Sequence, residues 1–365
     1  MSRTRVPTYA ILCLSALCAI WLSAPHLAPA DVAPGASASP APSSPPTTLA
    51  DLRTLSAQNR AKLRTCVLRL TVQEWAVRSS ETDTMRQVQL QTHHEAHRQK
   101  TLAHASGIGA TEATLKKLED QLLEHAARAE RGVVVERLNR SLSLRRVTTI
   151  DFASERVRHE DQDLRDLPRL IAEHGLDDLE ALGLDRSGTL IIDRERYVQL
   201  NARAGNRGFA LRSTGAELEV ERKHLGLVPE WLLDGKYDVE CRVVDGPSDR
   251  ALQVVGREGA RIAFVILLRP DLGNVMTQLT LFNPSGGVGE DFVASDFREV
   301  GGVFVPFHTL QRRTLKGPAD HRVERRTVEK VEINPTLPAD AKLFEIPEGS
   351  RVQDMTEAER AAGAP

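Results

Sequence analysis

The sequence is poor in aromatic residues and has no excess of charge of either sign. Phe, Tyr and Trp together make up 4% of the 365 residues, and the formal net charge is −2. Without a basic excess the chain has no electrostatic footprint for nucleic acid, so we expect no nucleic-acid partner. The hydrophobic share of 41% and the charged share of 27% are ordinary for a soluble globular protein.

The common catalytic and cofactor-binding motifs are also missing. GxSxG, SxxK, CxxC and GxGxxG do not occur, and the GGVG run at 286–289 is expected to be a loop because no lysine follows it. Acidic residues are plentiful, but they fall at strand ends and in charged helices, where a solvated surface is expected. We therefore predict no catalytic residue, no cofactor and a non-enzymatic protein.

A histidine-rich run, HHEAH, is the one pattern that suggests a metal site. His93 and His97 are four residues apart, which brings two imidazoles to one face of a helix. The HExxH order is absent, however, because Glu95 stands one place too late. A solvated polar segment is therefore favoured over a zinc site, and no metal is predicted.

No apolar run in the first thirty residues reaches the length of a membrane-spanning helix. Arg3 and Arg5 precede a 16-residue apolar run, Tyr9 to Ala24, which is short of the roughly 20 residues that cross a bilayer. Ala28-Pro29-Ala30 then gives the small residues that signal peptidase requires. The pattern predicts a Sec signal peptide, residues 1–30, and a periplasmic or extracellular protein. An uncleaved anchor is the alternative.

Residues 31–48 are almost entirely Ala, Pro, Ser and Thr, which bury too little apolar surface to fold. We predict a flexible tether there, one folded domain over residues 49–354, and a disordered tail over 355–365. Removing the signal peptide leaves 46 basic and 50 acidic residues, a charge of −4.

Only two cysteines follow the signal peptide, Cys66 and Cys241. Export makes a disulfide between them chemically possible. Each shares its strand parity with apolar neighbours, so two buried thiols are the favoured alternative.

Strand patterns dominate after residue 189. Alternating segments are separated by Asp-Gly, Glu-Gly, Gly-Gly and similar turns, which are typical of hairpins. Strands joined by such short links must be antiparallel, and about a dozen of them in one sheet must curl. The expected strands in this part are TLIIDRERYVQL, ELEVERK, YDVECRVVD, ALQVVG, RIAFVILLR, VMTQLTLF, DFVASDFREV, VFVPFHTLQRR and HRVERRTVEKVEI. The arginines that alternate with acids, as in the last of these, are expected on a solvated face.

The first half of the domain mixes helices and strands. We expect a short helix from Leu49 with Thr48 as its N-cap, a strand from Cys66, and a second strand over VVVERLNRSLSLRRVTTIDF. Helical insertions are predicted near 83–131, with 111–131 the clearest part, and near 160–183, where Pro168 and Gly175 bound one of two short helices.

The last third of the chain resembles the LolA/LolB-like superfamily, the exported outer-membrane lipoprotein-sorting carriers and their relatives. The resemblance covers roughly residues 260–354. It consists of a hairpin DFREVGGVFVP, a strand ending VEIN, and then LP followed by FEIPEG. The matching positions are Phe297, Arg298, Glu299, Val300, Gly302, Pro306, Val331, Ile333, Asn334, Leu337, Pro338, Phe344, Pro347 and Gly349.

The resemblance implies an α+β fold, with a long, strongly curved antiparallel sheet that forms an unclosed half-barrel round helices. It also implies a hollow that holds an acyl chain or a lipidated partner, with possible peripheral contact with an envelope membrane. The chain departs from the family in its two helical insertions and its Pro-rich tether.

The residues expected to line such a hollow share the inner parity of their strands and carry no charge. They are Leu68, Leu70, Leu142, Leu144, Ile262, Phe264, Ile266, Val303, Val305 and Phe307. Two functions follow from them. The hollow binds an acyl chain, as in a carrier or sensor, or the protein's own helices fill it, as in a structural or regulatory envelope protein.

The signal-peptide prediction has a direct test. Protein purified from its native envelope or culture medium should begin at Asp31 in N-terminal mass spectrometry, because cleavage is expected after Ala30. A native N-terminus at Met1 or Ser2 would exclude cleavage.

Overall fold

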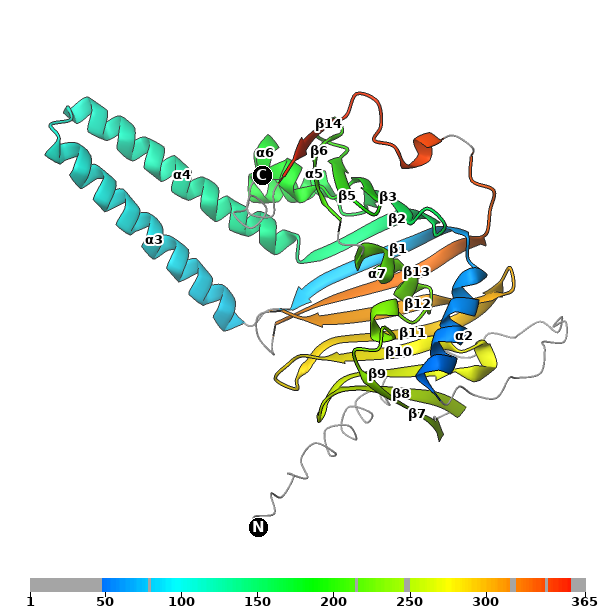
Figure 1. Cartoon of the computed structure of the whole chain (residues 1–365). Coiled ribbons are helices and arrows are strands. Elements are labelled where there is room, and N and C mark those ends of the chain that lie inside the picture. The colour runs from blue at the N-terminus through cyan, green and yellow to red at the C-terminus, as the bar shows by residue number, and fades with distance from the viewer. Residues whose placement is uncertain are drawn as a thin grey trace, which may run out of the picture. The chain divides into compact units, whose positions relative to one another are not determined.

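The computed structural model describes residues 48–77, 80–213, 216–245, 250–315, 320–338 and 341–355, which fall in one compact unit. Its centre is a 14-stranded sheet with the strand order β14-β6-β5-β4-β3-β2-β1-β13-β12-β11-β10-β9-β8-β7 (Figure 1). The described strands form an unclosed, curved α+β half-barrel, as the sequence predicts. The strands are β1 Thr65–Val77, β2 Ser141–Asp151, β3 Arg156–Asp163, β4 Gly188–Ile192, β5 Arg196–Asn201, β6 Arg207–Arg212, β7 Asp238–Asp245, β8 Arg250–Glu258, β9 Arg261–Arg269, β10 Val275–Phe282, β11 Val288–Val300, β12 Val303–Thr314, β13 His321–Ile333 and β14 Arg351–Asp354.

Neighbouring strands are antiparallel, except that β14 runs parallel to β6. The hairpin between β11 and β12 illustrates how a short turn makes consecutive strands antiparallel. Val300 pairs with Val303, and the two linking residues, Gly301 and Gly302, have φ angles of 60° and 76°. Positive φ at both positions is the geometry of a type I′ turn, which favours glycine and matches the twist of the strands.

Pro306 in β12 lacks the N–H that a central strand needs, so the sequence places it at a covered position or an edge. It is buried, and it pairs with Phe297 of β11. The pairing of β12 with β13 begins only at His308. Pro306 therefore lies in a part of β12 whose described pairing is with β11 alone.

The helices are α2 Leu49–Ala61, α3 Ser80–Gly107, α4 Glu112–Leu138, α5 Leu167–His174, α6 Asp178–Leu184 and α7 Ala216–His224, with short 3-10 turns η2 Glu230–Leu232, η3 Pro270–Leu272 and η4 Ala341–Phe344. Two of them begin as predicted. Thr48 and Asp51 form a capping box at α2, and α5 has Pro168 in its first turn and Gly175 at its C-terminus with φ of 59°.

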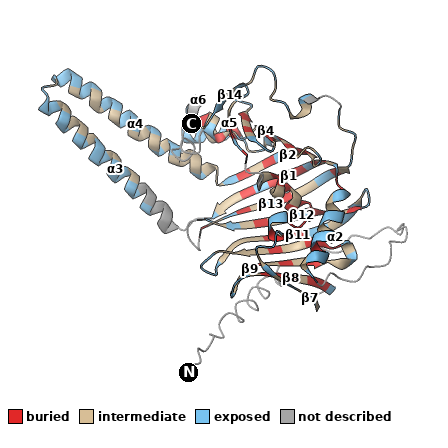
Figure 2. Cartoon of the chain, viewed as in Figure 1, coloured by how far each residue is buried: buried red, intermediate tan, exposed pale blue. Residues whose placement is uncertain are grey.

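The first insertion is more helical than the sequence indicates. α3 and α4 form an antiparallel pair joined by Arg98 and Glu119, 2.7 Å apart, and residues 93–105, in the less clear part of the predicted insertion, lie wholly inside α3. α4 extends to Leu138, so the strand expected from residue 133 begins only at Ser141. α4 contains no buried residue, and in Figure 2 the part of α3 whose burial is described also lacks the red of buried side chains.

Three further strand boundaries correct the sequence prediction. The HEDQD segment is the end of β3, so the second insertion is helical only from Leu167. TLIIDRERYVQL is a hairpin, β4 and β5, and not one strand. ELEVERK, expected to be a strand, lies in helix α7.

Two apolar clusters form most of the core. The first joins α7 and residues 225 and 227 to inner side chains of β1, β2, β3, β12 and β13. The second joins α2 and residues 228–233 to β8, β9, β10 and β11. Both clusters lie on the face of the sheet that α7 and α2 cover, which we call the inner face (Figure 1).

A glycine in the second cluster gives a test of this packing. A Cβ at Gly256 of β8 would lie 2.0 Å from Cε1 of Phe264, a fully buried ring on the neighbouring strand. We therefore expect Gly256→Ala to lower the free energy of unfolding by about 1–3 kcal/mol through overpacking.

The matched control is Gly132→Ala in α4, where nothing lies within 4 Å of the added Cβ. That change should be neutral or stabilise the protein by up to about 1 kcal/mol, because alanine favours a helix. Urea unfolding of both variants measures the difference. Equal stability of the two variants would contradict the described β8–β9 packing.

Candidate functional site

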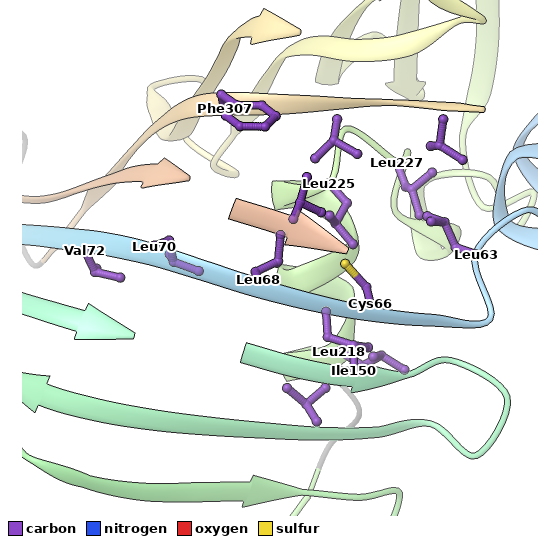
Figure 3. Packing of buried hydrophobic residues seen from close by; sticks show 14 of the residues in the cluster. Leu63, Cys66, Leu68, Leu70, Val72, Ile150, Leu218, Leu225, Leu227 and Phe307 are labelled. Carbon is purple, nitrogen blue, oxygen red and sulfur yellow. The ribbon is translucent and has the colours of Figure 1, made fainter. Parts of the chain in front are cut away.

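The inner face of the sheet is covered by the chain's own segments. We call α7 and residues 225–233 the cover. Leu218, Leu225 and Leu227 of the cover are buried against β1 and β12, and Figure 3 shows them gathered with Cys66, Leu68 and Phe307. Leu232 and Leu233, beside α2, extend the cover over β8 and β9.

The predicted hollow-lining residues fall into two groups under this cover. Leu68, Leu70, Leu144, Val303, Val305 and Phe307 join the first apolar cluster, and Phe264 and Ile266 join the second. Leu142 is buried at the margin, with 9% of its surface exposed, and Ile262 is only half-buried. The structure thus brings eight of the ten into contact with cover-bearing clusters, but it does not unite them in one open hollow.

A small cavity marks the boundary between cover and sheet. It measures about 10 Å³ and is lined by Leu52 of α2, Leu227 and Leu233 of the cover, and Val254, Ile266 and Leu268 of the sheet, among others. That volume is about the space one water molecule needs, far below the roughly 300 Å³ of a small-molecule site. Here the cover and the sheet are closely packed.

A layer of charged side chains is buried between α7 and the sheet. Arg326 of β13 has 5% of its surface exposed, and its Nη1 donates to both carboxylate oxygens of Glu221 on α7, at 3.0 and 2.8 Å. Its Nε donates to Glu324, two residues away on the same strand, at 2.6 Å. One guanidinium is therefore shared between a carboxylate of the sheet and a carboxylate of the cover.

Two buried histidines flank this arginine. His159 of β3 contacts the Thr148 hydroxyl through Nδ1 at 2.9 Å, and its Nε2 is 3.7 Å from Glu221. His224, at the end of α7, contacts Thr309 of β12 through Nδ1 at 2.8 Å. Its Nε2 lies 3.5 Å from Glu324. His159 of the sheet thus faces Glu221 of α7, and His224 of α7 faces Glu324 of the sheet. These are the two carboxylates that Arg326 binds.

A second ion pair ties α7 to the neighbouring strand. Lys223 donates to Glu290 of β11 at 2.5 Å, and Arg313 of β12 donates to the same glutamate at 3.0 Å. The Lys223 ammonium also lies 5.3 Å from the centre of the Phe292 ring. The cover is therefore held by two charge pairs of α7 as well as by its leucines.

The layer contains a donor without a partner. Gln311 of β12 is 3% exposed, and within the described part of the chain its Nε2 has no hydrogen-bond partner. Gln311 pairs across the strands with Glu324, and Thr309 pairs with Arg326. Side chains paired in this way on one face lie about 5 Å apart, so Gln311 borders the Arg326 site.

The pKa values of these groups follow from burial and from their partners. Burial alone would raise the pKa of Glu221, but the charge and hydrogen bonds of Arg326, together with His159 and His224, outweigh it and lower that pKa to about 2. Burial lowers the pKa of His159 to about 4, with Arg146 adding to the effect, and lowers the pKa of His224 well below its usual value. Burial also lowers the pKa of Lys223 to about 8. At neutral pH the histidines are thus neutral and Glu221 is charged.

Sequence reasoning missed this layer for two reasons. HRVERRTVEKVEI was expected to present its arginines to solvent, but Arg326 is buried because α7 brings Glu221 to it. ELEVERK was expected to be a strand. The helical signal was present, however, because Leu218, Glu221 and Leu225 recur at spacings of three and four residues along one face.

The sequence holds two further patterns, a possible disulfide and a histidine pair. Cys66 on β1 and Cys241 on β7 are free thiols on strands that six others separate, so the possible disulfide is absent. Cys66 is buried, and burial raises its pKa to about 12. His93 and His97 stack with ring centres 6.5 Å apart, but no described group of three or more His, Cys, Asp or Glu side chains is arranged to hold a metal ion. Among the described helices none is long and apolar enough to span a membrane.

No protein-family model matches the sequence, and no curated protein matches it. Solved structures do match it. A LolA superfamily protein from Nitrosomonas europaea is 9% identical, with a TM-score of 0.39 and coverage of 82% of this chain and 98% of that one. A domain named for outer membrane lipoprotein sorting, from Vibrio parahaemolyticus, is 5% identical, with a TM-score of 0.40 and coverage of 80% and 96%. A DUF1329 family protein from Desulfovibrio piger is 8% identical, with a TM-score of 0.42 and coverage of 81% and 97%.

Two of these solved structures bear the name of the family that the C-terminal third of the sequence resembles.

The neutral histidines predict how stability depends on pH. The unfolded chain binds a proton at His159 below about pH 6.5, whereas the folded chain does so only below about pH 4. The free energy of unfolding therefore carries no penalty from His159 above about pH 6.5. As the pH falls from about 6.5 to about 4, it decreases by on the order of 3 kcal/mol in total. Urea midpoints measured at pH 7, 6 and 5 should fall in that order.

The His159→Gln variant should show a flatter fall over the same range, because it lacks the titrating imidazole. His174→Gln, at an exposed position of α5, is the control and should keep the wild-type slope. Identical slopes in all three proteins would show that His159 is not held neutral by burial.

Proposed function

We propose that this protein is an exported, non-enzymatic carrier or sensor that binds an acyl chain, or the acyl chain of a lipidated partner, between its cover and its inner face. The observation that supports the proposal is the boundary between the cover and the inner face of the sheet. The sheet presents a wall of aliphatic and phenyl side chains, and separate short segments, α2 and the cover, lie over it.

The wall supplies the affinity that such a ligand needs. Val305, Phe264, Ile266 and Leu70 have at most 1% of their surface exposed. Apolar contact of this kind gives roughly 0.8 kcal/mol for each buried methylene and does not depend on ligand shape. An acyl chain that replaces the leucines of the cover keeps the wall out of water.

The cover is suited to moving away from the wall as a unit. α7 has nine residues, fewer than an isolated helix needs to be stable in water, so its contacts with the sheet hold it in place. The contacts of the whole cover combine three buried leucines, of which Leu218 lies in α7, with ion pairs at Glu221 and Lys223. Displacing the cover breaks a limited set of contacts and leaves the strand ladder intact.

The close packing of the cover favours the second function, a structural or regulatory envelope protein whose hollow its own segments fill. The cavity of about 10 Å³ admits no acyl chain unless the cover moves. The two functions differ in whether the cover exchanges with a ligand.

Export is part of the proposal and rests on the signal pattern in residues 1–30. A protein that receives acyl chains in the periplasm or outside the cell would contact an envelope membrane peripherally.

A variant of the cover tests the exchange. Leu225 is 2% exposed, and Leu225→Ala opens space under the cover and weakens its hold on the sheet. We expect the affinity for a fluorescent fatty acid to rise several-fold, while the free energy of unfolding falls by about 2–5 kcal/mol. Fluorescence titration and urea unfolding measure the two effects.

The matched control is Leu200→Ala in β5, an equally buried leucine in a separate cluster with Ile191, Val198 and Ala210. It should cost similar stability and leave the affinity unchanged. Absence of binding in the wild type and in Leu225→Ala, at the highest probe concentration below micelle formation, would favour the filled hollow. An equal rise in affinity in Leu225→Ala and Leu200→Ala would mean that a general loss of stability causes the binding, and not a weakened cover.

A further inference from the structure

The carboxylate that neutralises Arg326 belongs to the part of the molecule that a ligand would displace. Glu221 reaches Arg326 from α7, whereas Glu324, His159 and Thr148 belong to the sheet. If α7 moves, Nη1 of Arg326 loses both of its carboxylate contacts. Glu324 still accepts from Nε, but the Nη1 donors are left unsatisfied in a buried place, which is unfavourable, so this position favours another charged acceptor.

The surroundings of Arg326 also offer donors beyond those that the cover uses. Gln311 Nε2 is buried and has no hydrogen-bond partner among the described residues. His159 Nε2, 3.7 Å from the Glu221 carboxylate, faces the same position from β3. An acceptor held at Nη1 of Arg326 therefore has further nitrogen atoms close to it.

We propose that Arg326 is the head-group site of the carrier, that it takes a carboxylate borne on the acyl ligand, and that Glu221 fills this site while the cover is in place. The inference rests on the proposed function, because it requires the cover to leave the inner face. It adds the chemical class of the ligand, an acyl chain with a free carboxylate.

The charges left on the sheet favour a single negative charge over a phosphate. Without α7, Arg326, Arg146 and Arg313 still face Glu324, Asp161 and Glu290. These acids match the arginines in number, so a ligand adds its whole charge to a neutral set, and a single carboxylate in the place of Glu221 adds the least. A phosphate monoester brings a charge of about −1.5 to −2 into the same space and meets more repulsion from the sheet carboxylates.

The experiment compares three ligands of the same chain length on the full mature protein. They are a fluorescent fatty acid, its methyl ester and the corresponding acyl glycerol phosphate, each kept below its micelle concentration. We expect wild-type protein to bind the acid about tenfold more tightly than the ester, because a hydrogen-bonded charge pair is lost in the ester. The acid should also bind more tightly than the phosphate.

Two variants assign this preference to Arg326. Glu221→Gln removes the internal competitor, so the ratio of acid to ester affinity should rise further. The double variant Glu221→Gln/Arg326→Gln removes both charges, and its ratio should fall to about one while both ligands still bind. The control pair, Arg131→Gln/Glu180→Gln, breaks an ion pair of 2.7 Å between α4 and α6, away from the cover, and should keep the wild-type ratio.

The possible results separate the two proposals. Equal binding of acid and ester by the wild type overturns the head-group site and leaves the carrier standing. Tighter binding of the phosphate overturns the carboxylate class. No binding of any ligand overturns the carrier itself. Where the double variant does not fold, as judged by circular dichroism, the ratio in Glu221→Gln decides, and an unchanged ratio there overturns the role of Arg326.

Discussion

The pairing of β1 with β13 is the interaction on which the rest of the fold depends. The two strands pair from Cys66 and Ile333 to Val77 and His321, joining the start of the described chain to its last long strand. β2 to β6 extend the sheet on one side, and β7 to β12 extend it on the other. Each side is built largely from local hairpins, whereas this pairing closes a long loop. It alone makes one continuous inner face that a single cover can span.

The same pairing explains where the buried charges lie. Arg326 stands opposite Val72 of β1, in the middle of the inner face, with both halves of the sheet around it. A buried ion pair is weak evidence for stability, since apolar residues of similar volume often serve as well. We interpret the pair of Arg326 and Glu221 as a positional constraint. Leucines pack against an aliphatic wall at many places, but Glu221 has one guanidinium to meet, so α7 is fixed at one position.

The sequence predicted the parts of this structure that local pattern determines. The Gly301-Gly302 hairpin, the capping box at Thr48 and the strands from β8 to β13 follow from residue spacing and turn chemistry. The charged layer does not, because Arg326 and Glu221 are 105 residues apart and each lies in a run of alternating acids and bases. ELEVERK alone is too short for its period to separate helix from strand, and the helical spacing shows only when Leu225, beyond this segment, is included. Only tertiary contact turns a segment that looks solvated into the centre of the site.

The two contributions of the cover differ in what could replace them. Its leucines give apolar burial, which is non-directional, so on the proposed function an acyl chain of suitable length would substitute for them. Its Glu221 gives a charged acceptor to Nη1 of Arg326, and leaving those donors unsatisfied in a buried site costs on the order of 1–3 kcal/mol although Glu324 still pairs with Nε. On the proposed function, a neutral chain would displace the cover against this cost, whereas a chain that carries its own carboxylate would replace both contributions at once. The layer that keeps the inner face closed would then also select which ligand opens it.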